Sequence, residues 1–139
     1  MMISGVVLGL VLLVAPQAPP TAEQLLSRLD LTSFRNSTGP RHLAAPSTPS
    51  AAGFLEASST GDGSASRSSG HWRLDLTILE VRGEAIDACF RDVAESGGSY
   101  FVQTVLTLTP AAGGYVARKG PAYAACPEWR RRSDAAPRP

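Results

Sequence analysis

The two thiols are the most reactive side chains in this sequence, and they can form a disulfide, bind a metal or act as nucleophiles. Cys89 and Cys126 are the only cysteines among the 139 residues, and they do not form a CxxC redox motif. His42 and His71 could complete a set of four zinc ligands, but these residues show none of the short spacings that zinc sites use. We therefore expect one bridge between Cys89 and Cys126, with two free buried thiols as the alternative, and no metal or cofactor.

The other side chains that could support catalysis lack a motif that would assemble them. The sequence has no GxSxG nucleophile elbow, no GxxxxGK(S/T) phosphate loop and no HExxH helix. His42 and His71 are expected at the surface or at a sheet edge. Asp87 and Asp92 could do acid–base work as a pair, but carboxylates in a small domain are usually solvated. We expect no catalytic residues and no enzyme activity; an enzyme of unknown class that uses Asp87, Asp92 or His71 is the alternative.

The N-terminal segment bears on the compartment in which the cysteines would be oxidised. Residues 3–15 form a run of thirteen residues without a charge. This run is shorter than the roughly 20 residues of a membrane-spanning helix and typical of the apolar core of a secretory signal. Cleavage after Ala22 is expected, because cleavage after Ala18 would place Pro19 just past the scissile bond. We expect a signal peptide over residues 1–22, no permanent membrane span and a periplasmic or secreted protein, with an uncleaved anchor as the alternative.

An oxidising compartment would make the bridge a large part of the stability. Closing a loop of about 38 residues gives roughly 4 kcal/mol in the chain-entropy model. A small domain has a free energy of unfolding of about 5–15 kcal/mol. The cysteine pair is thus expected to cross-link a small fold.

Length and charge limit the classes of protein and partner. The chain is of the size of one domain, and a monomer is expected. The 13 basic and 12 acidic residues give a net charge of +1, so no nucleic-acid partner is expected. Lys119 is the only lysine, and the arginine, alanine, glycine and proline content is typical of a GC-rich bacterial genome.

Alternating apolar and polar residues predict two strands with most clarity, residues 72–81 and 100–109. In the first, Arg73, Asp75 and Thr77 form the polar side, and the alternation breaks at its end, which indicates a bulge or burial on both faces. Gly61, Asp62 and Gly63 predict a hairpin turn between residues 54–60 and 64–69. Residues 110–114 predict a turn into a short partner strand over 115–119.

The segment over residues 84–95 fits either a helix or a strand, and we favour a strand over 85–90, which continues the meander with short connections. Residues 21–31 predict a short helix in which Thr21 and Gln24 have the spacing of a capping box. Residues 42–53 indicate a mobile surface loop. Residues 127–139 indicate a flexible Arg/Pro-rich tail in which Trp129 packs near the bridge.

Together these elements predict an all-β fold. We expect a small antiparallel meander of five to seven strands, an open barrel or sandwich, preceded by a short helix after the signal peptide. The single β domain would span residues 23–126, between the signal peptide and the tail over 127–139.

Two short patterns are similar to motifs of a known family. The stretch from Ser96 to Tyr100 matches SGxxY, and the stretch from Tyr115 to Gly120 matches part of a Tyr-x-x-x-(Thr)-Lys-Gly pattern. Both patterns resemble motifs of the small periplasmic lysozyme inhibitors of the MliC type. Two features differ: Arg118 replaces the threonine, and the gap between Tyr100 and Tyr115 is longer than the gap usual in that family. The resemblance implies a compact antiparallel β-barrel with a disulfide, with Ser96 and Lys119 inserted into a lysozyme cleft and Tyr100 in support.

The leading functional hypothesis is an exported bacterial protein that acts as a non-catalytic binding or interaction module of the cell envelope. Its partner would be an envelope or extracellular protein or ligand. The expected signal peptide, the cysteine pair and the lack of a catalytic motif motivate this hypothesis. A periplasmic lysozyme inhibitor and an enzyme of unknown class are the alternatives.

Overall fold

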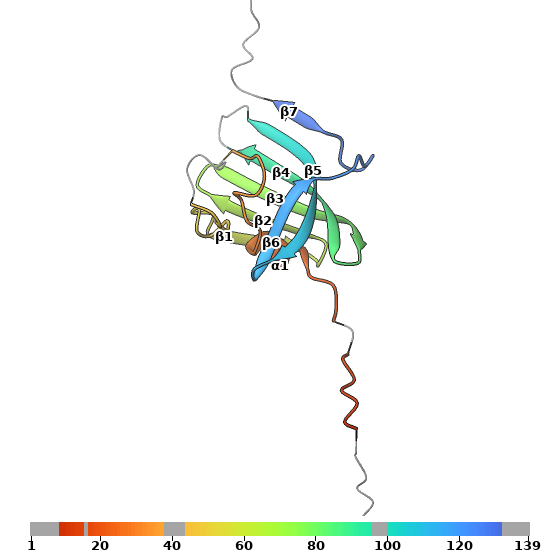
Figure 1. Ribbon diagram of the computed structural model, residues 1–139. Helices are drawn as coiled ribbons and strands as arrows, with labels where there is room; N and C mark the ends of the chain where they lie inside the picture. Colours follow the sequence, from red (N-terminus) through yellow and green to blue (C-terminus); the bar gives the residue numbers. More distant parts are fainter. Residues whose placement is uncertain (1–8, 16, 38–43, 96–99, 132–139) are drawn as a thin grey trace, which may run out of the picture.

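The fold is one open antiparallel sheet with a short helix against it, as Figure 1 shows. The computed structural model describes residues 9–15, 17–37, 44–95 and 100–131. The sheet order is β1-β2-β3-β4-β5-β6, a meander in chain order, and β7 pairs with β5 beside this path. The predicted all-β antiparallel meander with a short N-terminal helix is confirmed. The elements are α1 (Ala22–Ser27), β1 (Glu56–Thr60), β2 (Ser64–Ser69), β3 (Trp72–Arg82), β4 (Ala85–Ala94), β5 (Phe101–Ala111), β6 (Gly114–Lys119) and β7 (Trp129–Arg131).

The strand β3 shows the predicted alternation and the predicted irregularity. Leu74 and Leu76 are buried, whereas Arg73, Asp75 and Thr77 lie on the other face. The pairing register with β4 shifts between Ile78 and Glu80, so that β3 carries a bulge where the alternation ends. The bulge explains why the last residues of this strand do not follow the pattern.

The ambiguous segment is a strand, β4, which is longer than the predicted 85–90. Residues 86–90 are all buried, because other side chains cover both faces of the sheet at this position. Ile86, Ala88 and Phe90 belong to the main core, whereas Cys89 belongs to a smaller cluster on the opposite face. Burial on both faces removes the alternation by which a strand is normally distinguished from a helix.

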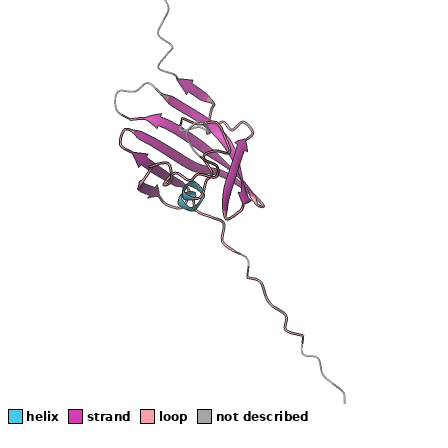
Figure 2. Cartoon of the chain, turned by 60° about the vertical axis from the view of Figure 1, so that its left-hand side comes forward, coloured by secondary structure: helices cyan, strands magenta, loops and turns pink. Residues whose placement is uncertain are grey.

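The main core lies between one face of the sheet, to which β2 to β6 all contribute, and α1 with the segment that follows it (Figure 2). Leu25, Leu26 and Leu29 have no exposed surface, and α1 contacts β1, β2 and β3. On the same face, Phe34 meets Phe90 edge to face, with ring centroids 5.1 Å apart. A helix of six residues is too short to be stable alone, so this packing holds it.

The helix begins with the predicted capping box. The Thr21 side chain accepts a hydrogen bond from the Gln24 backbone N–H, and the Gln24 side chain accepts one from the Thr21 N–H. Ala22 is fully buried, and its N–H donates to the carbonyl oxygen of Asp62 in the β1–β2 turn, at 2.7 Å. Thr21 and Ala22 are therefore integral to the folded domain.

The stretch that we predicted as a mobile surface loop is anchored to the fold at two buried residues, although most of its described residues are exposed. Ser47 and Pro49 are buried, and Ser47 accepts from the Leu31 N–H at 2.8 Å. The N–H of Phe54, another buried residue, donates to Pro49 O at 2.9 Å. The predicted surface location is therefore confirmed for most of the described stretch, whereas the burial of Ser47 and Pro49 was not foreseen; His42 lies outside the described residues.

The segment that we assigned to a flexible tail contributes the strand β7, which pairs with the first half of β5, whereas β6 pairs with the second half. Trp129 lies directly opposite Gln103 in this pairing and is 52 % exposed. Residues 132–139 lie outside the described residues. The strand was not foreseen, because three residues are too few to show a period.

The two cysteines come together as the sequence predicts. The sulfur atoms of Cys89 and Cys126 are 2.10 Å apart, and the residues are 37 positions apart in the chain. They form the small cluster with Val105, and Leu79 and Tyr123 pack against it. In the ranges that the structure describes, no helix has the length and apolar character that a membrane crossing requires.

Candidate binding surfaces

Asp87 and Asp92 are both fully buried, so the prediction that they are solvated was wrong. They lie five residues apart on one strand, and side chains alternate between the faces of a strand, so the two carboxylates lie on opposite faces of the sheet. They cannot act as a catalytic pair. His71, the third residue of the enzyme hypothesis, is exposed at the start of β3.

Asp87 joins three strands and the segment after β6. Arg82 donates two hydrogen bonds to its carboxylate, at 2.9 and 3.0 Å, and the hydroxyl groups of Thr107 and Tyr123 donate at 2.7 and 2.6 Å. Burial alone would raise the pKa of Asp87, but the hydrogen bonds from Arg82, Tyr123 and Thr107 lower it to about 2. The carboxylate is therefore ionised and structural.

Asp92 has no ionic partner within the described ranges. Its carboxylate accepts hydrogen bonds from the N–H and the hydroxyl group of Ser37 and from the indole N–H of Trp72. Burial raises the pKa of Asp92 above the ordinary value, and the hydrogen bonds from Ser37 and Trp72 offset part of that shift. These bonds fasten the segment after α1 to the sheet, so Asp92 also has a structural role.

Of the residues that the inhibitor motif singles out, the structure describes Tyr100 and Lys119, which lie far apart. Tyr100 packs against Trp72, with ring centroids 5.2 Å apart, just before β5 begins. Lys119 is 72 % exposed, pairs with Glu128 at 3.1 Å and lies opposite Leu106. Tyr100 and Leu106 are six positions apart along the chain, roughly 20 Å at strand geometry. Ser96 lies outside the described residues.

One face of the sheet carries a continuous polar array, which we call the polar face. Register places Ser58, Ser66, Asp75 and Arg91 directly opposite one another across β1 to β4, and Gln103 and Trp129 continue the row on β5 and β7. A shallow cavity of about 470 Å³ lies over the first four strands. It is lined by Ser58, Ser64, Ala65, Ser66, Ser68, Arg73, Asp75, Thr77, Arg91 and Glu95.

Hydrogen bonds connect the side chains of the polar face, and its charges balance. Arg73 donates to Asp75 at 2.9 Å and to Glu95 at 2.7 Å, and Ser66 donates to Asp75 at 2.7 Å. Arg91 donates through Nε to the Gln103 side chain at 2.7 Å. Two guanidinium groups therefore face two carboxylates, so the lining of this cavity has no net charge.

Several groups of the polar face remain available to a ligand. Within the part of the chain that the structure describes, the Nη groups of Arg91 and the hydroxyl groups of Ser58 and Ser68 make no hydrogen bond. Trp129 adds an exposed indole ring at the end of the row. The face thus offers donors, hydroxyl groups and one aromatic surface on a fixed sheet.

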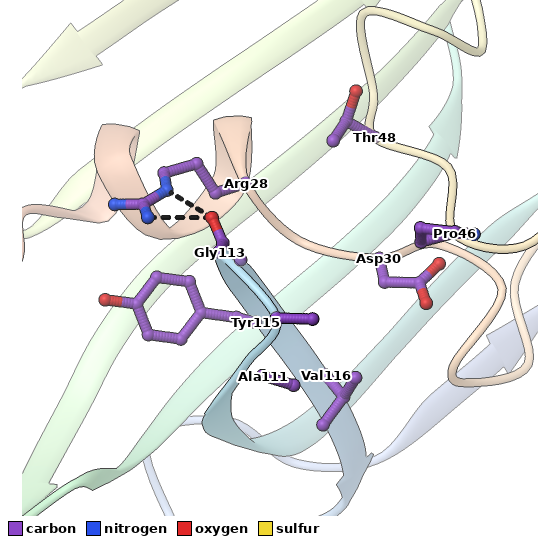
Figure 3. Close-up of a pocket in the computed structure, with 10 residues that line it drawn as sticks. Arg28, Asp30, Pro46, Thr48, Ala111, Gly113, Tyr115 and Val116 are labelled. Carbon is purple, nitrogen blue, oxygen red and sulfur yellow. Dashed lines mark hydrogen bonds between the residues drawn. The ribbon is translucent and has the colours of Figure 1, made fainter.

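A second cavity lies where the β5–β6 hairpin meets the end of α1, and we call it the hairpin pocket (Figure 3). Its volume is about 250 Å³. Asp30 donates its N–H to Tyr115 O at 2.8 Å, and Tyr115 donates its N–H to Arg28 O at 2.9 Å. A Cβ atom at Gly114 would lie 2.5 Å from Arg28 O, so only glycine permits this close approach. The lining residues are Arg28, Asp30, Pro46, Thr48, Ala111, Ala112, Gly113, Gly114, Tyr115 and Val116.

Two charged side chains border the hairpin pocket. Arg28 donates to Gly113 O through Nε at 3.1 Å and through Nη2 at 2.7 Å, and its guanidinium lies 5.8 Å from the centre of the Tyr115 ring. The Oδ1 atom of Asp30 accepts from the N–H and hydroxyl of Thr32, at 2.9 and 2.6 Å, and from the Ser47 N–H at 3.1 Å. Although burial raises it, these hydrogen bonds leave the pKa of Asp30 below its ordinary value.

No model of a known protein family, no curated protein and no solved structure matches this chain.

Sequence reasoning found part of these surfaces. It placed Arg73, Asp75 and Thr77 on one polar strand face, and that face is the centre of the polar array. It missed Arg28 and Asp30, although an aspartate two residues before a threonine is a recognisable turn signal. The partners of these two residues lie in the β5–β6 hairpin and in the loop around residue 47, which no local pattern connects to them.

Proposed function

We propose that this protein is an exported, non-catalytic binding domain of the bacterial cell envelope, and that its polar face binds a glycan of that envelope. The observation that carries the proposal is the row of hydroxyl groups and paired charges from β1 to β4, which ends at Trp129. The ligand is neutral or weakly charged, because the arginine and carboxylate charges of the surface balance.

A hydroxyl-rich polymer fits the chemistry of this face. Each sugar hydroxyl both donates and accepts hydrogen bonds, and the face offers guanidinium donors, carboxylate acceptors and serine hydroxyl groups that do either. The indole ring of Trp129 supplies an apolar surface with a polar edge, against which a sugar ring can pack. The open, shallow form of the cavity admits a chain rather than a small enclosed molecule.

The two buried carboxylates favour a binding role over a catalytic one. Asp87 and Asp92 are both committed to hydrogen bonds that tie strands and loops together, so neither is presented to a substrate. The export part of the proposal rests on the uncharged run over residues 3–15 and on the cysteine pair, which an oxidising compartment would keep bridged.

The test is co-sedimentation of the purified protein with peptidoglycan sacculi, with Arg91→Ala as the variant and Arg118→Ala as the matched control. Both arginines are exposed on strands, but only Arg91 lines the cavity over β1 to β4. Loss of hydrogen bonds from a charged donor weakens binding about tenfold, so Arg91→Ala should reduce the bound fraction and Arg118→Ala should leave it unchanged. Equal binding by both variants, or no binding by the native protein, would contradict the proposal.

The same preparations test the lysozyme-inhibitor alternative. An inhibitor would slow the lysis of a cell-wall suspension by a c-type lysozyme, and Lys119→Ala would restore the rate. Inhibition with that pattern would replace the glycan proposal, whereas unimpaired lysis would remove the alternative.

A further inference from the structure

We infer that the hairpin pocket is a second binding site, which takes a short peptide with a free amine at one end and a free carboxylate at the other. The inference is independent of the glycan proposal, because the pocket shares no lining residue with the polar face. It rests on two opposite charges that line one cavity together with several apolar residues.

The pocket is formed in advance of any ligand. The two bonds from Arg28 to Gly113 O fix the hairpin turn to the end of α1, and the bond from Leu31 N to Ser47 O fixes the third wall. A site held in this way loses little conformational entropy on binding. Its volume of about 250 Å³ equals that of roughly eight liquid water molecules, which suits a molecule of dipeptide size.

Asp30 provides the negative end. Its Oδ1 atom already accepts three hydrogen bonds, whereas no donor among the described residues reaches Oδ2. Nor does any described cation form an ion pair with this carboxylate. An ionised carboxylate with one open oxygen matches the three N–H donors of an ammonium group.

Arg28 provides the positive end. Its Nε and Nη2 groups are engaged by the hairpin, whereas Nη1 makes no bond to a described residue. In Figure 3 the side chains of Arg28 and Asp30 lie on opposite sides of the strand that carries Gly113 and Tyr115. They do not neutralise each other by an ion pair, so a ligand with its charges at opposite ends would satisfy both.

Apolar residues form much of the remaining lining of the pocket. Pro46, Ala111, Ala112 and Val116 border the cavity and offer no side-chain donor or acceptor. A peptide with apolar side chains would bury them there. A simple anion or a simple cation would match one end and be repelled by the other.

The experiment is a two-dimensional NMR titration of the labelled full-length protein with L-leucyl-L-alanine, followed at the amides of Gly113, Gly114 and Tyr115. Saturable shifts at these amides are expected. The N-acetyl and C-amide derivatives of the same dipeptide should each bind at least about tenfold more weakly, because each loses one charge-assisted contact.

Two variants show which end of the dipeptide each charged side chain binds. Asp30→Asn keeps the Oδ1 acceptor on which the loop depends and removes the negative charge, and Arg28→Gln keeps a donor for Gly113 O and removes the positive charge. Asp30→Asn should abolish the discrimination against the N-acetyl form only, and Arg28→Gln the discrimination against the C-amide only. Asp62→Asn and Arg118→Gln, exposed charges outside the pocket, are the controls and should change neither.

The inference is overturned if the dipeptide and both derivatives bind with the same affinity, since the charges would then play no part. It is also overturned if the hairpin amides do not shift at saturating dipeptide, or if the shifts are confined to β2 and β3. A failure of glycan binding leaves these outcomes unaffected.

Discussion

Asp87 allows the most detailed prediction, because its contacts and its pKa are both defined. The change is Asp87→Asn, which preserves the size of the side chain and removes its charge. The pKa falls from 3.8 to about 2 in the folded protein. At about 1.36 kcal/mol per unit, that difference corresponds to at most about 2.4 kcal/mol of stability. Because Arg82 is 47 % exposed and its charge is screened by solvent, we expect a loss of about 1–2 kcal/mol at pH 7.

The sign follows from the direction of the shift. A carboxyl group whose pKa is lower in the folded state stabilises the fold above the unfolded pKa, and this contribution is lost as the pH falls through the folded pKa. The difference between the native protein and Asp87→Asn should therefore be largest above pH 4 and shrink to a few tenths of a kcal/mol near pH 2.

The assay is urea unfolding of both proteins at pH 7, 4, 3 and 2, with Asp62→Asn, an exposed turn residue, as the control. The control should show no difference that depends on pH. The reasoning about Asp87 would be refuted if the variant lost the same free energy at every pH, since the loss would then come from packing rather than from charge.

Three further changes test other parts of the fold by urea unfolding. Replacing both Cys89 and Cys126 by alanine should lower the free energy of unfolding by about 2–4 kcal/mol, and an unchanged midpoint under oxidising conditions would show that the bridge contributes nothing. Thr21→Ala removes the helix cap and should cost about 1 kcal/mol; no change would mean that the cap is dispensable. Gly114→Ala places a Cβ atom 2.5 Å from a backbone oxygen at the end of α1 and should cost about 1–3 kcal/mol, whereas Gly63→Ala, where the space is open, should cost less; equal effects would contradict the close approach.

The strands were predictable where one face is buried and the other is not. The alternation in β3 reveals both its register and its bulge, and glycine and aspartate mark the β1–β2 turn. The strand β5 was predicted from its alternation of apolar and polar residue types, although residues 102–108 are buried on both faces. The strand β4 was harder, because residues 86–90 are covered on both faces and give no period. Its assignment depended on its neighbours, since a strand there joins two firm strands by short connections.

The buried carboxylates could not be predicted from local sequence. Asp87 is bonded to Thr107 and Tyr123, which are 20 and 36 residues away, and Asp92 is bonded to Ser37, which is 55 residues away. A carboxylate without visible partners is expected to be solvated. Only the assembled sheet shows that hydrogen-bond donors surround each of these carboxylates. Likewise, only the assembled fold shows that the two walls of the hairpin pocket lie next to each other.

The signal peptide, the compartment and the partner remain predictions from the sequence. The capping box bears on the first of them, because cleavage after Ala22 would remove Thr21 and the first turn of a helix that packs in the core. We therefore expect that the mature protein, if it is cleaved, begins upstream of Thr21. Mass spectrometry of protein purified from its host would locate that end.

The central claim is that the polar face is the binding surface, and the most direct measurement is an NMR titration of the labelled protein with chitotetraose. The account predicts saturable shifts at the amides of β2, β3 and β4 around Ser66, Asp75 and Arg91, and at the indole N–H of Trp129. Shifts confined to the opposite face or to the hairpin pocket, or none at saturating oligosaccharide, would contradict it.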